Sequence, residues 1–199
     1  MSMLPSWASS DADSMRLTEK QYDALPDEVR KRIEVIGGNV VFLHSGTREH
    51  NRVARRLAHA LEAARPDSPC VEVNTDVDVQ FVKWNREDRG FSFRRPDVSV
   101  NRCLDRGAKL MSSDVLLAAE VVSPGSAYID TVDKVAEYAY EGIPVYLVVH
   151  LDGDLYVKLI QEYRLDWVSR TYRLVETHQG QLVLDDPFPA KVPFSELDD

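Results

Sequence analysis

The stretch that decides the fold is LLAAEVVSPGSAYIDTVDKVAEYAYEGIPVYLVV, residues 116–149. The first apolar run, Val115–Val122, contains one carboxylate, Glu120, and the last run, Val145–Val149, is rich in β-branched residues. Near-continuous apolar runs of this kind are typical of strands that are buried on both faces of a sheet. We therefore predict two central strands, with a lone acid near the end of the first.

The segment between these strands is predicted to be a turn followed by a helix. Pro124 and Gly125 interrupt the first strand, because proline lacks an amide donor and glycine tolerates open dihedral angles. From Ile129 to Glu141 apolar residues recur at helical spacing, and Gly142 with Pro144 ends the helix. A strand, a helix and a strand within about 35 residues predict a parallel crossover unit.

The length of 199 residues predicts one domain, residues 15–199, after a flexible extension of residues 1–14. The extension lacks the basic segment and apolar core of a secretory signal. No apolar run approaches the roughly 20 residues that cross a bilayer, so we expect no membrane association. Cys70 and Cys103 are too few for a disulfide framework and indicate a reduced, cytoplasmic location.

The rest of the chain is predicted to form short elements around the central unit. Before it we expect a helix at 17–25, a hairpin at 33–36 and 40–43, a helix at 48–64, a strand at 71–82, a charged loop at 83–90 and a strand that ends at 100. After it we expect an antiparallel meander at 155–160, 164–168, 172–177 and 182–184. The predicted class is α/β, a mixed sheet with helices on its faces and an antiparallel C-terminal extension.

The charge balance limits the choice of partners. With 24 basic and 33 acidic residues the net charge is −9, whereas proteins that hold long nucleic acids by the backbone are usually basic. A local basic groove can still coexist with an acidic remainder. Candidates for such a basic rim are Arg52, Arg55 and Arg56 on the predicted helix, or Arg94 and Arg95.

Three acids and one lysine are the candidates for chemistry. Glu34 and Glu120 stand within apolar strands, Asp97 begins another, and Lys134 lies in the helix after Glu120. Two or three converging carboxylates suit Mg²⁺, which prefers oxygen ligands and keeps several waters. Such an ion stabilises charge on a phosphoryl group and activates water, while a nearby lysine supplies positive charge.

Each candidate also has an ordinary structural explanation. Acids at strand ends commonly face water, Glu34 fits the surface of a hairpin, and His50 fits a surface or packed histidine. Glu120 is harder to explain in this way, because a lone buried carboxylate is costly. On a helical wheel Lys134 lies opposite the apolar arc, and Asp130 four residues earlier predicts a solvated salt bridge.

The ordered combination of segments is more specific than any single spacing. RIEVIGGNVVF, EHNRVARRLAHAL, RRPDVSV and the stretch from AAEVV to YLVV resemble the Uma-two family (Uma2) of predicted nucleases. That family belongs to the PD-(D/E)XK, restriction-endonuclease-like superfamily. The resemblance runs from about Leu17 to Val149, weakly beyond, and it implies a restriction-endonuclease-like core.

The resemblance implies metal ligands residue by residue. Pro96-Asp97 matches the PD motif, whose aspartate is a ligand, and Glu120 matches the second acidic ligand. Val121 would offer its backbone carbonyl. Glu34 matches the upstream acid of the family's first hairpin and is included among the catalytic residues.

The catalytic lysine departs from the superfamily pattern. It normally stands two residues after the second acid, where this chain has Val122, so the resemblance points to Lys134 on the next helix. Four residues are assigned to substrate binding: Arg52, Gln80, Arg95 and Tyr138.

The leading interpretation is a cytoplasmic, Mg²⁺-dependent endonuclease that hydrolyses DNA with metal-activated water. Mn²⁺ is the substitute ion considered, and a homodimer is the oligomer considered. One alternative is a non-catalytic nucleic-acid- or protein-binding relative, which the net charge and Val122 favour. The other is a metal-dependent hydrolase of a smaller phosphoester.

Overall fold

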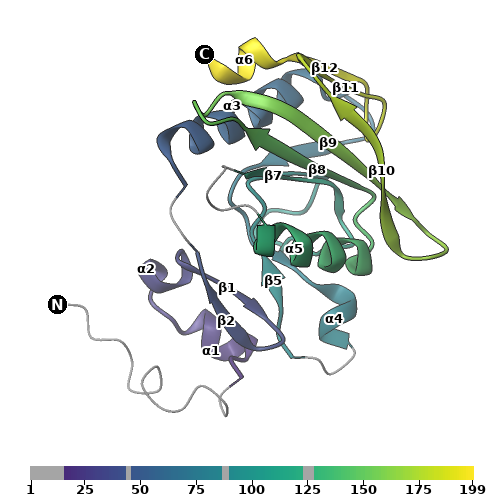
Figure 1. Cartoon of the computed structure of the whole chain (residues 1–199). Helices are drawn as coiled ribbons and strands as arrows, with labels where there is room; N and C mark the ends of the chain where they lie inside the picture. The colour runs from purple at the N-terminus through teal and green to yellow at the C-terminus, as the bar shows by residue number, and fades with distance from the viewer. Residues whose placement is uncertain (1–15, 44–45, 87–89, 123–127) are drawn as a thin grey trace.

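The computed structural model describes residues 16–43, 46–86, 90–122 and 128–199 (Figure 1). The predicted flexible extension and the turn at Pro124 and Gly125 lie outside these residues. The described chain forms a six-stranded sheet, a four-stranded sheet and a two-stranded sheet.

The six-stranded sheet has the order β10-β9-β8-β7-β6-β3. Its strands are β3 Val71–Asn74, β6 Val98–Arg102, β7 Val115–Val122, β8 Val145–Leu151, β9 Val157–Asp166 and β10 Thr171–His178. β7 and β8 are parallel neighbours in the middle of the sheet, and α5, Tyr128–Glu141, connects them. The predicted crossover unit is therefore confirmed, and neither strand lies at an edge.

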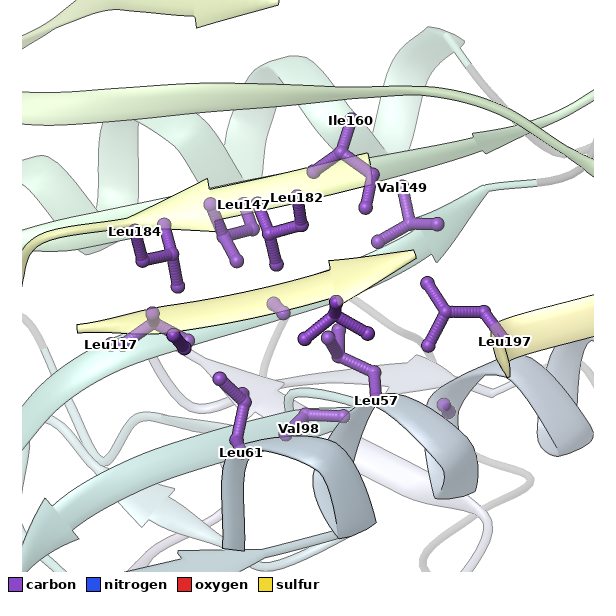
Figure 2. Close-up of a cluster of buried hydrophobic side chains, with 14 of the residues drawn as sticks. Leu57, Leu61, Val98, Leu117, Leu147, Val149, Ile160, Leu182, Leu184 and Leu197 are labelled. Carbon is purple, nitrogen blue, oxygen red and sulfur yellow. The ribbon is translucent and has the colours of Figure 1, made fainter. Parts of the chain in front are cut away.

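Helices cover the two faces of this sheet (Figure 1). On one face α3, Arg48–Ala64, packs Val53, Leu57 and Leu61 against the sheet, together with the C-terminal segments (Figure 2). These segments are β11 Gln181–Leu184, β12 Ala190–Pro193 and α6 Phe194–Asp198. On the other face α5 buries Tyr138 against Tyr146 of β8, with ring centroids 5.3 Å apart.

The four-stranded sheet is built by the N-terminal region and has the order β2-β1-β5-β4. Its strands are β1 Ile33–Ile36, β2 Asn39–Phe42, β4 Val79–Gln80 and β5 Phe93–Arg94. The predicted hairpin is confirmed, since β1 pairs with β2 in antiparallel register. Two short helices, α1 Glu19–Asp23 and α2 Asp27–Arg30, flank the sheet, and Tyr22 of α1 packs on Phe93 of β5.

Three sequence-based boundaries are wrong for identifiable reasons. The strand predicted at 71–82 is split at Asp76, which has a φ of 53°, so β3 and β4 join different sheets. The charged loop predicted at 83–90 begins with α4, Val82–Arg86, because Glu141 accepts its first backbone amides. The strands predicted at 155–160 and 164–168 form one strand, β9, because the polar residue Glu162 is buried with His178 instead of making a turn.

The two cysteines also differ from expectation. Cys70 and Cys103 form a disulfide that joins the start of β3 to the end of β6, with Cα atoms 5.5 Å apart. The expected reduced state is therefore wrong in this structure. Among the described residues, none of the helices combines the length and the apolarity needed to cross a membrane.

Candidate active site

The antiparallel register of β6 and β7 brings the two predicted acidic ligands together. Val98 is opposite Ala119, so Asp97, just before β6, stands across from Glu120. Asp97 Oδ2 accepts the backbone N–H of Val121 at 2.7 Å, which fixes one carboxylate beside the backbone of the other. Asp97 and Glu120 thus lie on adjacent strands of one sheet, and their role as metal ligands stays a prediction.

Glu120 is buried and both of its oxygens have partners. Oε1 accepts the hydroxyl of Tyr138 at 2.9 Å, and Oε2 lies 2.9 Å from Lys134 Nζ. Burial raises the pKa of Glu120 to about 7, and Asp97 and Glu34 add to the rise, while Lys134 opposes it. This carboxyl is thus poised near neutrality, as functional carboxyls often are.

The ammonium group of Lys134 is the cation of this cluster. Burial by itself would lower the pKa of Lys134, but Glu120 and Glu34 outweigh burial and raise it. The two shifts thus have different causes, because burial raises the pKa of Glu120, whereas the neighbouring carboxylates raise the pKa of Lys134. The carboxylates of Asp97 and Glu120 and the ammonium group of Lys134 therefore form one electrostatically coupled cluster.

The inward position of Lys134 corrects the helical-wheel expectation of a solvated residue. Its side chain is 14% exposed, whereas Ala136 on the predicted apolar arc is exposed. The inner face of α5 is lined by residues at positions i, i+3, i+4 and i+7, namely Lys134, Glu137, Tyr138 and Glu141. Each has a specific partner on another element. The spacing of these polar residues is the signal that could have identified this face.

Glu34 lies beside this cluster but is held by arginine. Arg94 Nη1 donates to Glu34 Oε2 at 2.8 Å, and the backbone N–H of Arg95 donates to Oε1 at 2.7 Å. Arg94 also makes a two-bond contact with Glu137 of α5, at 2.7 and 2.9 Å. Both oxygens of Glu34 therefore have partners on β5 and the residue after it, and its assignment as a catalytic group stays a prediction.

Four predicted substrate-binding or rim residues have structural partners. Arg95 forms an ion pair with Asp78 and donates to backbone carbonyls of α2 and its C-terminal cap. Gln80 donates its amide to Glu19 at 3.2 Å. Tyr138 is fully buried and donates to Glu120, so it orients that carboxylate and does not face a substrate. Arg94 is likewise buried and cannot form a basic rim.

Helix α3 approaches the carboxylates with its first turn. Thr47 caps the helix by accepting the N–H of His50, and His50 Nε2 lies 3.1 Å from Asp97 Oδ1. Burial would lower the pKa of His50, but the carboxylate of Asp97 outweighs it and raises the pKa. His50, expected to be an ordinary packed histidine, thus orients Asp97.

A cavity of about 770 Å³ opens between α3 and the loop that joins β3 to β4. Asp97 and Asp76 stand at this cavity, and burial together with Asp97 raises the pKa of Asp76. Asp76 falls inside the strand predicted at 71–82 and has no predicted role, because its positive φ is not visible in the alternating pattern. The cavity is lined by Arg48, Asn51, Arg52, Ala54, Arg55, Thr75, Asp76 and Asp97.

The donor set fits a hard divalent cation that is completed by water or substrate. Asp97 and Glu120 place carboxylate groups on adjacent strands at the same edge of the site. Within the described residues no three His, Cys, Asp or Glu side chains converge, so a closed cage of the zinc type is not formed. Mg²⁺ needs only one or two carboxylates in addition to substrate phosphate.

Comparisons with known proteins identify the family of this chain. Residues 19–193 match Uma2, which is described as "Putative restriction endonuclease". The chain belongs to the Uma2 family. No curated protein matches it.

A solved structure is similar in fold to this Uma2 protein. It is the crystal structure of a "putative nuclease belonging to DUF820 from Anabaena variabilis ATCC 29413". The TM-score is 0.62 and the identity 12%, with 91% of the Uma2 chain and 97% of that chain covered. The likeness shows the fold, and the expected restriction-endonuclease-like core is confirmed.

Proposed function

We propose that this protein is a metal-dependent nuclease that hydrolyses phosphodiester bonds of DNA. The observation that carries the proposal is the convergence of Asp97, Glu120 and Lys134 at the ends of β6 and β7, within a chain of the Uma2 family. Two carboxylates beside a lysine are the groups that phosphoryl transfer with a hard cation requires.

In the proposed reaction each residue of the cluster would have a separate role. Asp97, Glu120 and the carbonyl of Val121 would hold Mg²⁺ or Mn²⁺. The bound ion would supply charge stabilisation for the phosphoryl group and lower the pKa of a water molecule. Lys134 would then stabilise negative charge that develops on the substrate, since its ammonium lies next to Glu120. Tyr138 and His50 would keep the two carboxylates in place.

Metal binding and hydrolysis separate the roles of the acids and the lysine. Calorimetry with Mn²⁺ should show binding to the wild type and its loss in Asp97→Asn and Glu120→Gln. Lys134→Gln should keep Mn²⁺ binding, because it removes a competitor for Glu120, but should lower plasmid cleavage by about 10²-fold or more. Glu28→Gln on the exposed face of α2 is the matched control and should change neither.

The same assay distinguishes the alternatives. Cleavage of a small phosphodiester without cleavage of plasmid would favour the hydrolase of a smaller phosphoester. Absence of Mn²⁺ binding, or unchanged binding in Glu120→Gln, would refute the site and favour a non-catalytic relative. The cytoplasmic location and the homodimer stay predictions, which cell fractionation and analytical ultracentrifugation would test.

A further inference from the structure

We infer that the cavity beside α3 binds the phosphate backbone of duplex DNA and reads little of its sequence. This inference rests on the proposed function, because the cavity opens directly onto Asp97. It adds the position of the flanking substrate and the kind of recognition. A DNA strand bound in this cavity would run from the carboxylate cluster along the N-terminal half of α3.

The basic residues of the cavity form a line on one face of α3. Arg48, Arg52 and Arg55 are spaced i, i+4 and i+7, so they project from the same side of the helix. At 1.5 Å of rise per residue the line is about 10 Å long, which corresponds to about three phosphates of one DNA strand. The opposite side of α3 is buried in the core.

The cavity arginines differ from the other arginines around the site in their partners. Arg94 and Arg95 form ion pairs with buried or half-buried carboxylates. Within the described residues Arg52 and Arg55 form no ion pair, and Arg48 is paired only with the neighbouring Glu49 at the surface. Guanidinium groups without a carboxylate partner are available for phosphate oxygens, which they bind in a forked geometry.

The remaining lining indicates recognition of the backbone instead of the bases. Proteins that hold single strands stack bases on aromatic rings, and the described lining of this cavity contains no aromatic residue. Asn51 and Thr75 are short polar groups that suit phosphate contacts. Duplex DNA, which presents its phosphates outward with the bases already stacked, is therefore the substrate that fits.

The acidic remainder of the molecule restricts the footprint. The net charge of the protein is −9, so DNA that extends beyond the arginine line meets an unfavourable electrostatic potential. Three phosphate contacts predict a slope of about −2.7 in a plot of log affinity against log salt concentration, far shallower than that of proteins with long footprints.

The test is salt-dependent binding of a labelled duplex in EDTA, measured by fluorescence anisotropy, where metal-dependent cleavage does not interfere. Arg52→Gln and Arg55→Gln should each weaken binding and make the salt slope shallower by about one. Arg56→Gln is the matched control, because Arg56 is on the same helix but does not line the cavity, and it should leave the slope unchanged. Circular dichroism confirms that each variant is folded.

Several results would overturn the inference. These are equal slopes in all three variants, tighter binding of single strands than of duplex, affinities that differ more than tenfold between duplexes of unrelated sequence, or no binding by the wild type. Cleavage assays on the same proteins separate this from the proposed function. A wild type that binds as predicted but does not cleave with Mg²⁺ or Mn²⁺ refutes only the nuclease, whereas cleavage with unaltered slopes refutes only the backbone cavity.

Discussion

Glu120 shows at the scale of one residue how the site departs from an ordinary core. Its pKa of about 7 lies above the value of about 4.5 for an exposed glutamate, and burial is the main cause. The folded state binds this proton more tightly than the unfolded chain does. The resulting stabilisation is fully present below about pH 4.5, the pKa of an exposed glutamate, and is lost as the pH rises through 7. Above pH 7 the fold therefore holds a carboxylate at a cost in stability, which Lys134 partly offsets.

His50 and Asp97 give a prediction that can be measured without metal or substrate. The pKa of His50 in the wild type should exceed 6.5, because Asp97 favours the imidazolium form. In Asp97→Asn the burial stays and the charge is lost, so the pKa should fall below 6.5. NMR titration of the His50 ring measures both values. The contact stabilises the fold at pH values below 6.5 and weakens as the pH rises through the raised value. An unchanged pKa in Asp97→Asn would refute the pairing.

At the scale of elements, α5 connects the carboxylate cluster to α4. Glu141 at its C-terminal end accepts the backbone amides of Val82, Lys83 and Trp84 at 2.7 to 3.1 Å, and the hydroxyl of Ser112 at 2.6 Å. Glu141 thereby satisfies amides of the first turn of α4, which have no partner within a helix. The position of α5 along its axis is fixed at this end.

Glu141→Gln should lower the free energy of unfolding by about 1–3 kcal/mol, because a neutral amide cannot accept all of these hydrogen bonds. Urea denaturation followed by circular dichroism measures the change. The exposed acid Glu28 provides the control, and Glu28→Gln should stay within about 0.5 kcal/mol of the wild type. Equal stability of the two variants would show that Glu141 does not anchor α4.

The sequence predicted the elements that are governed by periodicity and missed those governed by buried charge. The apolar runs of β7 and β8 and the spacing of α3 were sufficient, since burial of apolar residues determines them. The inner face of α5 was missed because three of its four residues are charged and are held by partners distant in the sequence. Arg94 was expected at the surface for the same reason, since a pattern does not reveal that Glu34 and Glu137 enclose it.

At the scale of the molecule, one guanidinium group joins the two larger sheets. Arg94 belongs to the four-stranded sheet, contacts Glu34 within it, and contacts Glu137 on the helix that covers the six-stranded sheet. Arg94→Met would leave two buried carboxylates without a cation, and should lower the free energy of unfolding by about 3–5 kcal/mol. Thermal unfolding should show this loss, while Arg106→Met, at an exposed position, should be close to neutral. A stable Arg94→Met variant would contradict the proposed link.

The position of Arg94 has a consequence for how this protein can change over generations. Active-site residues can often be exchanged for ones that raise heat resistance at the expense of turnover. Glu137, which Arg94 fixes, lies one helical turn from Lys134, so loss of the guanidinium would lower heat resistance and displace the proposed catalytic cation together. Selection for heat resistance alone would therefore preserve the arrangement that the proposed activity needs, even in a lineage without selection for that activity.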